Sequence, residues 1–253
     1  MSERPANPSI AQLRTVCQPI SVTGRSNAEH WVADLYLRRI SLYLTRILLK
    51  TSITANAVTY LMIVTGLSIS LALQIDGWSG VILALILSQV QMLWDCCDGE
   101  IARWRGTQSP KGIFLDRVGH YLTEALIPLA LANRVREGSD YELLFLAALI
   151  SLLIVLNKGF NDSVHVARAF SQLPKIADSA SVGSPKSTLL RVARAPFRIF
   201  AVQRLFHSVE MSILIAIFAA NPNLIRYGLP LALFVTAGHL ISIIGSSKLE
   251  KSR

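Results

Sequence analysis

The sequence predicts an all-α integral membrane protein, a bundle of six membrane-spanning helices preceded by an amphipathic helix. Of its 253 residues, 52% are hydrophobic and only 16% are charged, and the mean hydropathy is +0.45. A soluble domain of this length carries more charge and shorter apolar runs. Six apolar stretches are long enough, or nearly so, to supply the about 20 helical residues that cross a bilayer.

The N-terminal 27 residues are expected to form an irregular cytoplasmic arm. They are polar, they contain Pro5, Pro8 and Pro19, and they have no long apolar run. A secretory signal peptide needs such a run, so we expect none here and place the N-terminus in the cytoplasm.

Residues 28–50 are expected to form an amphipathic helix, with Asn27 as its N-cap. Leu35, Leu42 and Leu49 recur at heptad spacing on one face. A second face carries the basic residues Arg39, Arg46 and Lys50. This pattern favours a helix that lies in the headgroup region against anionic lipid, and a soluble helix packed on the domain is the alternative.

Residues 51–253 are expected to form the membrane domain. Its six spans are placed at Ala57–Ile75, Gly80–Arg103, Gly112–Ala132, Tyr141–Asn157, His207–Ala220 and Tyr227–Ser246. Pro128 and Pro230 fall inside spans, where bilayer helices tolerate proline as a kink. Residues 177–187 contain glycine, proline and several serines, and we expect them to form a loop.

The basic residues indicate the orientation of the spans. Of the 25 Lys and Arg residues, 21 fall before the first span, after the last span or in connections on the same side. The positive-inside rule therefore places both termini in the cytoplasm and the protein in the cytoplasmic membrane. Because the charges follow one membrane side and form no single stripe, they explain the formal net charge of +9 without a nucleic-acid partner.

The three cysteines are expected to be free thiols. Cys96 and Cys97 are adjacent inside an apolar run, Cys17 stands alone, and no C-x-x-C spacing is present. This usage indicates a reducing compartment or a position in the bilayer.

Acidic side chains inside two neighbouring spans mark the candidate functional site. Asp95 and Asp98 lie three residues apart near the end of the second span, and Asp116 and His120 lie four residues apart in the third. Each pair therefore shares one face of its helix. The two spans run antiparallel, so equal distances from the helix ends place Asp95 opposite His120 and Asp98 opposite Asp116.

This cluster predicts a bound divalent cation. Three carboxylates so close together would repel one another inside a membrane protein, and a cation removes that cost. Oxygen ligands suit Mg²⁺ or Mn²⁺, and a nitrogen ligand from His120 shifts the preference toward Mn²⁺. His120 also suits a general base at neutral pH. Glu124, one turn further on the same face, is expected either to hold the imidazole or to be the base itself.

Small and basic residues lie beside the acidic cluster. Gly99, Ala102 and Gly112 allow a ligand to approach the backbone, or allow helices to approach each other. Arg103 and Arg105 lie at the mouth of the site, where each either binds phosphate or marks the membrane boundary. A cation, a base and phosphate-binding groups together favour attack by a hydroxyl on a phosphoanhydride at the cytoplasmic surface.

The spacing of these residues resembles the signature of the CDP-alcohol phosphotransferases. Their pattern, D-x-x-D-G-x-x-A-R, matches from Asp95 to Arg103, and the fixed positions that follow match at Gly112 and Asp116. The last position, an aspartate in the family, is His120 here. Residues 53–59 are similar to the family's weaker T-P-N-x-x-T stretch, with alanine where proline is usual.

The resemblance implies an integral membrane homodimer that moves a substituted phosphate from a CDP-linked donor to an alcohol and releases CMP. It implies metal ligands at Asp95, Asp98 and Asp116. It implies contact with, or space for, the cytidine nucleotide at Asn56, Thr59, Gly99, Ala102, Arg103 and Gly112. In the family, the fourth acid is both a metal ligand and the proposed base. His120 stands at that position here, so binding of the second of two expected ions depends on whether the imidazole acts as a ligand.

The donor and acceptor stay open on sequence alone. The lipid setting favours CDP-diacylglycerol over a soluble CDP-polyol as donor. Inositol phosphate, glycerol phosphate and other polyols are all compatible acceptors. Candidate ligands for an acceptor phosphate are the basic residues Arg105, Lys111, Arg168 and Arg191, and charge that merely sets topology is the alternative for them. The polar run that starts at Lys158 is a further candidate.

Two other function classes compete with the enzyme. A cation-coupled transporter would also place carboxylates in its spans, but these acids gather at the ends of two spans only. A catalytically degenerate membrane scaffold of the same fold would explain His120 at the fourth acidic position. Ion flux without CMP release would favour the first, and metal binding without transfer would favour the second.

Overall fold

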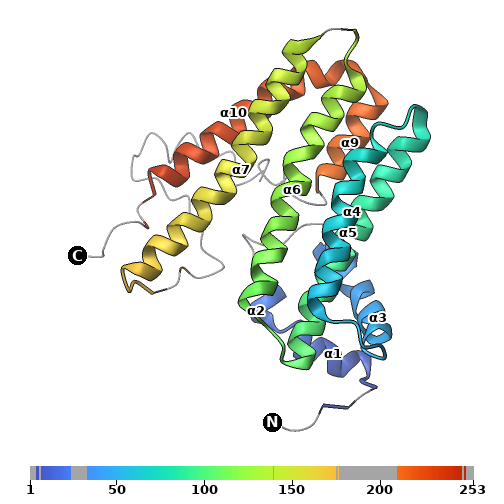
Figure 1. The fold of residues 1–253 in the computed structure, drawn as a ribbon, viewed down its shortest axis with the longest axis vertical. Helices are drawn as coiled ribbons and strands as arrows, with labels where there is room; N and C mark the ends of the chain where they lie inside the picture. Colours follow the sequence, from blue (N-terminus) through green and yellow to red (C-terminus); the bar gives the residue numbers. More distant parts are fainter. Residues whose placement is uncertain are drawn as a thin grey trace.

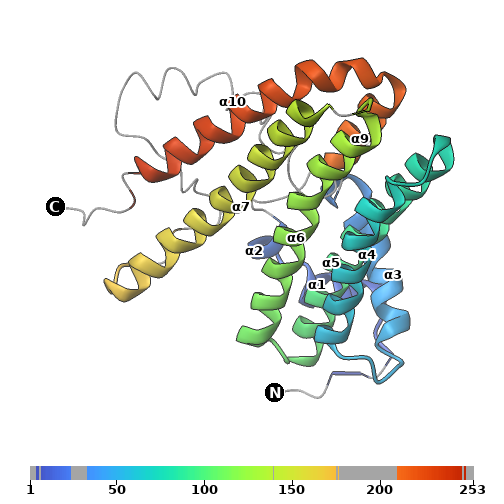
Figure 2. The same ribbon diagram turned by 45° about the horizontal axis from the view of Figure 1, so that its top comes forward.

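The computed structural model describes residues 4–5, 7–23, 33–138, 140–174, 176, 210–246 and 248. The regular elements among these residues are helices, and no β-strand occurs there. Four long helices follow one another up and down: α4 (Ala55–Ala72), α5 (Gly77–Arg105), α6 (Pro110–Val135) and α7 (Tyr141–Phe170) (Figure 1). They are followed by α9 (Met211–Ala220), the 3₁₀ turn η4 (Pro222–Leu224) and α10 (Ile225–Ile244). Helices α7 and α10 lie side by side and lean away from α4 and α5 (Figure 2).

Four helices in the described part of the chain are long and apolar enough to cross a membrane: α4, α5, α7 and the continuous run Pro222–Ile244. The chain is therefore an integral membrane protein. Helices stand at all six predicted positions, but α9 has only 10 described residues, and the first three residues of its predicted span lie outside the described residues. Helix α6 carries charged residues along its length: Lys111, Asp116, Arg117, Glu124 and Arg134. The count of six spans stays a prediction.

The α5–α6 hairpin has sharply defined ends. Gly106 closes α5 in the left-handed region, at φ +68°, where glycine is favoured because it has no Cβ. Ser109 caps α6 by accepting a 3.1 Å hydrogen bond from the Gly112 amide, and Pro110 occupies the first helical turn. These local signals fix the connection that brings the acidic segments of the two helices side by side.

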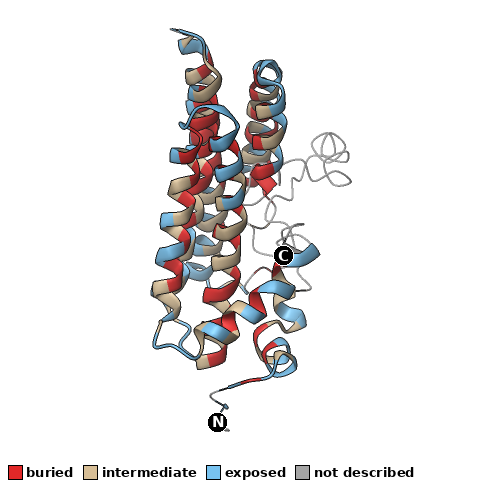
Figure 3. Ribbon diagram, turned by 90° about the vertical axis from the view of Figure 1, so that its right-hand side faces the viewer, coloured by how far each residue is buried: buried red, intermediate tan, exposed pale blue. Residues whose placement is uncertain are grey.

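Close contact between α4 and α6 depends on glycine. A Cβ at Gly66 would overlap the Thr123 side chain, and one at Gly119 would overlap Met62. The largest apolar core lies beyond this contact, away from the acidic residues, and includes Ile69 and Ile127. Figure 3 shows the buried residues gathered on the faces that the long helices turn toward one another.

The N-terminal segment is more helical than the sequence indicated. It forms α1 (Ile10–Cys17), which begins at a capping box between Ser9 and Gln12, and α2 (Ile20–Thr23). The predicted irregular arm is therefore wrong for these residues. The S-x-x-Q spacing was a signal for α1, but an eight-residue helix carries too little apolar periodicity to stand out.

The segment predicted to be an amphipathic helix contains the π-helical turn η1 (Ala33–Leu37) and α3 (Arg38–Leu48). Its predicted start, residues 28–32 with the cap Asn27, lies outside the described residues. The heptad leucines do not share one environment, because Leu42 is buried and Leu35 is 71% exposed. A different apolar face points outward, formed by Leu35, Ile40, Tyr43 and Ile47.

Helix α3 turns polar residues toward the protein. Glu100 of α5 is 0% exposed and accepts hydrogen bonds from Ser41 Oγ at 2.6 Å, Thr45 Oγ1 at 2.6 Å and Gln18 Nε2 at 2.7 Å. A buried carboxylate needs such donors, and this requirement explains why Ser41 and Thr45 face inward. The N-terminal helices are thereby attached to the helix that carries Asp95 and Asp98.

Candidate active site and metal centre

A cavity of about 440 Å³ lies between the N-terminal half of α4, the C-terminal half of α5 and the N-terminal half of α6. It is lined by ten of the residues predicted from sequence: Asn56, Thr59, Asp95, Asp98, Gly99, Ala102, Arg103, Gly112, Asp116 and His120. Arg38 of α3 and Ser109, the cap of α6, also line it. Sequence reasoning missed Arg38 because it was counted among the charges that set topology.

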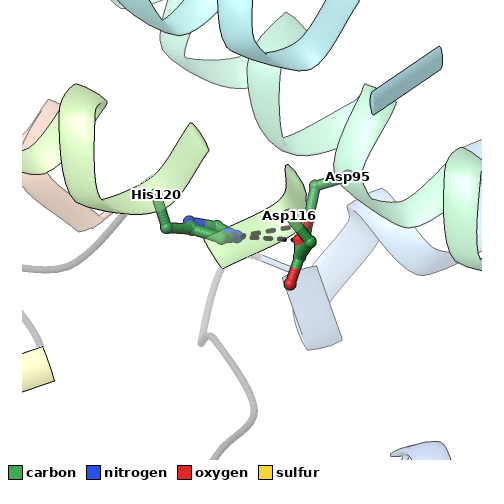
Figure 4. Close-up of side chains that lie close together, drawn as sticks. All are labelled: Asp95, Asp116 and His120. Atoms are coloured by element: carbon green, nitrogen blue, oxygen red, sulfur yellow. Dashed lines mark hydrogen bonds and ion pairs between the residues drawn. The ribbon is translucent and has the colours of Figure 1, made fainter. Parts of the chain in front are cut away.

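Asp95, Asp116 and His120 form the tightest cluster in this cavity. Each offers one ligand atom, and these atoms all lie within 4.8 Å of one another. His120 Nε2 lies 3.1 Å from Asp95 Oδ1 and 3.5 Å from Asp116 Oδ1 (Figure 4). Asp95 comes from α5 and the other two from α6, so the expected pairing of Asp95 with His120 across the hairpin is confirmed.

The donor set of this cluster fits a divalent cation. Both nitrogens of the imidazole face carboxylates, because Nδ1 lies 3.5 Å from Glu124 Oε1 while Nε2 faces Asp95 and Asp116. A neutral imidazole has a single N–H, so it cannot donate on both sides. A cation between these three side chains would be bound by the Nε2 lone pair and by one oxygen each of Asp95 and Asp116. This ligand set suits Mn²⁺ or Mg²⁺.

Asp98 lines the same cavity but stands outside the three-residue cluster. It is 8% exposed, and its Oδ2 accepts a 2.6 Å hydrogen bond from Thr59 Oγ1 of α4. Thr59 is itself buried. The structure therefore shows Thr59 holding the Asp98 carboxylate, a contact that the sequence did not predict.

The small residues make room for polar side chains at the cavity wall. A Cβ at Gly99 would lie 2.9 Å from Nη1 of Arg103, whose guanidinium folds back over the glycine. Arg103 Nε also donates a 2.6 Å hydrogen bond to the Cys17 carbonyl. At Gly112, a Cβ would lie 3.2 Å from Asn56 Oδ1. Both glycines therefore let a polar side chain lie close to the helix backbone at the cavity wall.

Three of the four predicted acceptor-phosphate residues, Arg105, Lys111 and Arg168, do not line the cavity. Arg105 donates to the carbonyls of Thr51 and Ile53 and closes the α3–α4 connection. Arg168 donates to the carbonyls of Pro174 and Lys248 at the end of α7. Lys111 is exposed outside the cavity lining, and Arg191 lies outside the described residues. Their role in binding an acceptor stays a prediction.

Glu124 connects the cluster to α7. Its side chain is 1% exposed, and Oε2 lies 3.0 Å from Lys158 Nζ. The sequence placed Lys158 in a polar run after the fourth span, but α7 continues without a break to Phe170. Lys158 therefore faces α6 from within the helix.

Comparison with known proteins identifies the family. The sequence model described as CDP-alcohol phosphatidyltransferase matches residues 52–220, which extends from just before α4 to the end of α9 and includes the whole acidic hairpin. Comparison with curated proteins gives no match. The matched segment covers more than half of the 253 residues. On this evidence, the chain belongs to the CDP-alcohol phosphatidyltransferase family.

Proposed function

We propose that the protein is a divalent-metal-dependent transferase that moves a substituted phosphate from a CDP-linked donor to an alcohol and releases CMP. The observation that carries the proposal is the convergence of Asp95, Asp116 and His120 at one cavity. Family membership supports transfer of a phosphate-linked group from a CDP-alcohol. The cluster lies on the two helices that carry the family's spaced residues.

In this proposal Asp95, Asp116 and His120 hold Mg²⁺ or Mn²⁺, and Asp98 joins them or binds a second ion. When bound there, the ion would supply positive charge to the phosphoanhydride and to the leaving CMP. Arg103 and Asn56 contact the nucleotide, and Gly99, Ala102 and Gly112 leave room for it. If the aspartates alone bind the ion, His120 is the base that accepts the proton of the attacking hydroxyl; if His120 is a ligand, Glu124 is the base.

The membrane setting favours a lipid donor. Four apolar helices and the outward apolar face of η1–α3 support a position in and at the membrane. We therefore propose CDP-diacylglycerol as the donor and a polyol or polyol phosphate as the acceptor. We also propose six spans with both termini in the cytoplasm, and a homodimer. The basic residue that lines the cavity from the membrane-facing helix, Arg38, is a candidate ligand for a phosphate.

The test is a CMP-release assay on the purified protein in detergent. Donors are CDP-diacylglycerol and a soluble CDP-polyol, acceptors are inositol phosphate, glycerol phosphate and free polyols, and each is run with Mg²⁺, Mn²⁺ or chelator. Metal-dependent CMP release that is lost in Asp95→Asn supports the proposal.

Two outcomes would contradict it. Mn²⁺ binding without CMP release from any donor would favour the scaffold, for which His120 at the fourth acidic position is the motivating observation. Cation flux into proteoliposomes without CMP release would favour a transporter.

A further inference from the structure

A half-buried lysine lies in the long apolar helix α7, on the side that faces α6. The Lys158 side chain is 19% exposed, and α7 is among the helices able to span a membrane. Its Nζ lies 3.0 Å from Glu124 Oε2 and 5.8 Å from the centre of the Tyr121 ring. Charged groups in such positions are costly and occur in pairs that serve a function.

The ion pair continues into the candidate metal centre. Glu124 Oε1 lies 3.5 Å from His120 Nδ1, and His120 Nε2 lies 3.1 Å from Asp95 Oδ1. Lys158, Glu124, His120 and Asp95 thus form one chain of alternating basic and acidic groups across three helices. The sequence motif ends at His120, so Lys158 stands outside it.

We infer that Lys158 is a positioning residue that, through Glu124, fixes the His120 imidazole with Nε2 directed at the metal-binding carboxylates. An ionised carboxylate only accepts hydrogen bonds, so a Glu124 oxygen 3.5 Å from Nδ1 favours the neutral tautomer that carries its proton on that nitrogen. The Nε2 lone pair is then presented to the cavity. Metal-binding histidines commonly gain their orientation from such an outer carboxylate. This inference rests on the proposed function for its effect on turnover.

Lys158 supplies what a buried Glu124 lacks. With Glu124 only 1% exposed, the carboxylate cannot be stabilised by water. The direct ion pair holds it against α7 and keeps Oε1 turned toward His120. Without the lysine, the buried carboxylate would lose its direct counter-charge and move, and the imidazole would lose its fixed orientation.

The α6–α7 interface offers a matched control. Asp162, one turn after Lys158, accepts a 2.6 Å hydrogen bond from Tyr121 and pairs with Arg117. This second link also joins α6 to α7 by charge, and among the described contacts it meets the proposed chain only at the Tyr121 ring, 5.8 Å from Lys158 Nζ. Asp162→Asn therefore weakens helix packing and leaves the ion pair of Lys158 with Glu124 in place.

The experiment compares Lys158→Met, Lys158→Arg and Asp162→Asn with the wild type. Mn²⁺ affinity is measured by electron paramagnetic resonance, kcat and KM by CMP release, and the His120 tautomer by ¹⁵N NMR of histidine-labelled protein with His120→Ala for assignment. Lys158→Met should weaken Mn²⁺ binding and lower kcat by about 10- to 100-fold with little change in donor KM, and should alter the His120 signal. Lys158→Arg should retain most of both, and Asp162→Asn should bind Mn²⁺ as the wild type does.

The double variant Glu124→Gln/Lys158→Met distinguishes loss of positioning from misfolding, because it removes both charges of the ion pair and leaves neither one buried alone. Neutral replacement of a whole buried ion pair often preserves stability. A purely structural pair therefore predicts wild-type Mn²⁺ affinity in this variant, whereas a positioning pair predicts the same loss as Lys158→Met. Wild-type affinity in Lys158→Met, or equal loss in Asp162→Asn, would overturn the inference. Loss of Mn²⁺ affinity in a protein that releases no CMP would support the inference while the proposed function fails.

Discussion

The imidazole Nε2 of His120 lies 3.1 Å from the Asp95 carboxylate on the facing helix, so a histidine takes part directly in the acidic hairpin. An aspartate at this position would add a further negative charge to the cluster. A neutral imidazole adds none, and it contributes a softer nitrogen donor. We therefore expect the choice between Mn²⁺ and Mg²⁺ to depend strongly on which residue stands at position 120.

The first prediction exchanges that donor. His120→Asp should keep CMP release and shift the preference from Mn²⁺ toward Mg²⁺, because an all-oxygen set suits the harder ion. His120→Ala should lower kcat by about 10²- to 10⁴-fold, since it removes a metal ligand or the proposed base. Titrating each metal in the CMP-release assay gives both results. Full turnover in His120→Ala would rule out either role for the histidine.

The second prediction concerns the hydrogen bond between Thr59 and Asp98. Thr59→Val removes a donor from a carboxylate that is 8% exposed, which should destabilise the protein by about 1–3 kcal/mol. Thr59→Ser keeps the hydroxyl and should remain near the wild type. Thermal unfolding in detergent, followed by circular dichroism, measures the difference. Equal midpoints for the valine and serine variants would show that the bond contributes nothing to stability.

The acidic hairpin could be predicted because its signals are local. The i, i+3 spacing of Asp95 and Asp98 and the i, i+4 spacing of Asp116 and His120 fix which side chains share a face. The short connection between the helices then fixes their depth relative to each other. The geometry of the pair Asp95–His120 follows from these two facts alone.

Contacts between helices that are distant in the chain could not be predicted in this way. The pair Glu124–Lys158 depends on which face of α7 packs on α6 and at what height, and a single sequence specifies neither. The same limit applies to α3. Heptad spacing predicted that Leu35 and Leu42 share a face, but Leu35 is exposed and Leu42 is buried. The need of Glu100 for hydrogen-bond donors turns Ser41 and Thr45 inward.

The third prediction tests the glycine contact between α4 and α6. Gly66→Ala should destabilise the protein by about 1–3 kcal/mol, because the added methyl group overlaps the Thr123 side chain. Gly159→Ala is the matched control, since a Cβ there meets nothing within 4 Å and alanine favours the helix. Thermal unfolding should therefore separate the two variants in opposite directions. Adding Thr123→Ala to Gly66→Ala should restore part of the loss, and no restoration would show that the overlap is not its cause.

The fourth prediction uses the thiol of Cys17, which lies in α1 outside the spans. Burial, and next the nearby Glu100 charge, raise the pKa of the Cys17 thiol to about 12. The folded protein therefore keeps this proton at pH values where an unfolded thiol, with a pKa of about 8.5, has lost it. Folding binds more protons in that window, so the contribution of Cys17 to stability is fully present below about pH 8.5 and falls as the pH rises toward 12.

A variant that carries Cys96→Ala and Cys97→Ala leaves Cys17 as its single cysteine. At pH 8.5 iodoacetamide should label it slowly in detergent and rapidly in denaturant, because only the thiolate reacts. Chemical unfolding at pH 7.5 and 9.5 should show a larger loss of stability in this variant than in its Cys17→Ala derivative, which has no thiol to ionise. Rapid labelling of the folded protein would mean that α1 does not stay packed over Glu100, and the link between the N-terminal helices and the helix of Asp95 would then be weaker than the hydrogen bonds indicate.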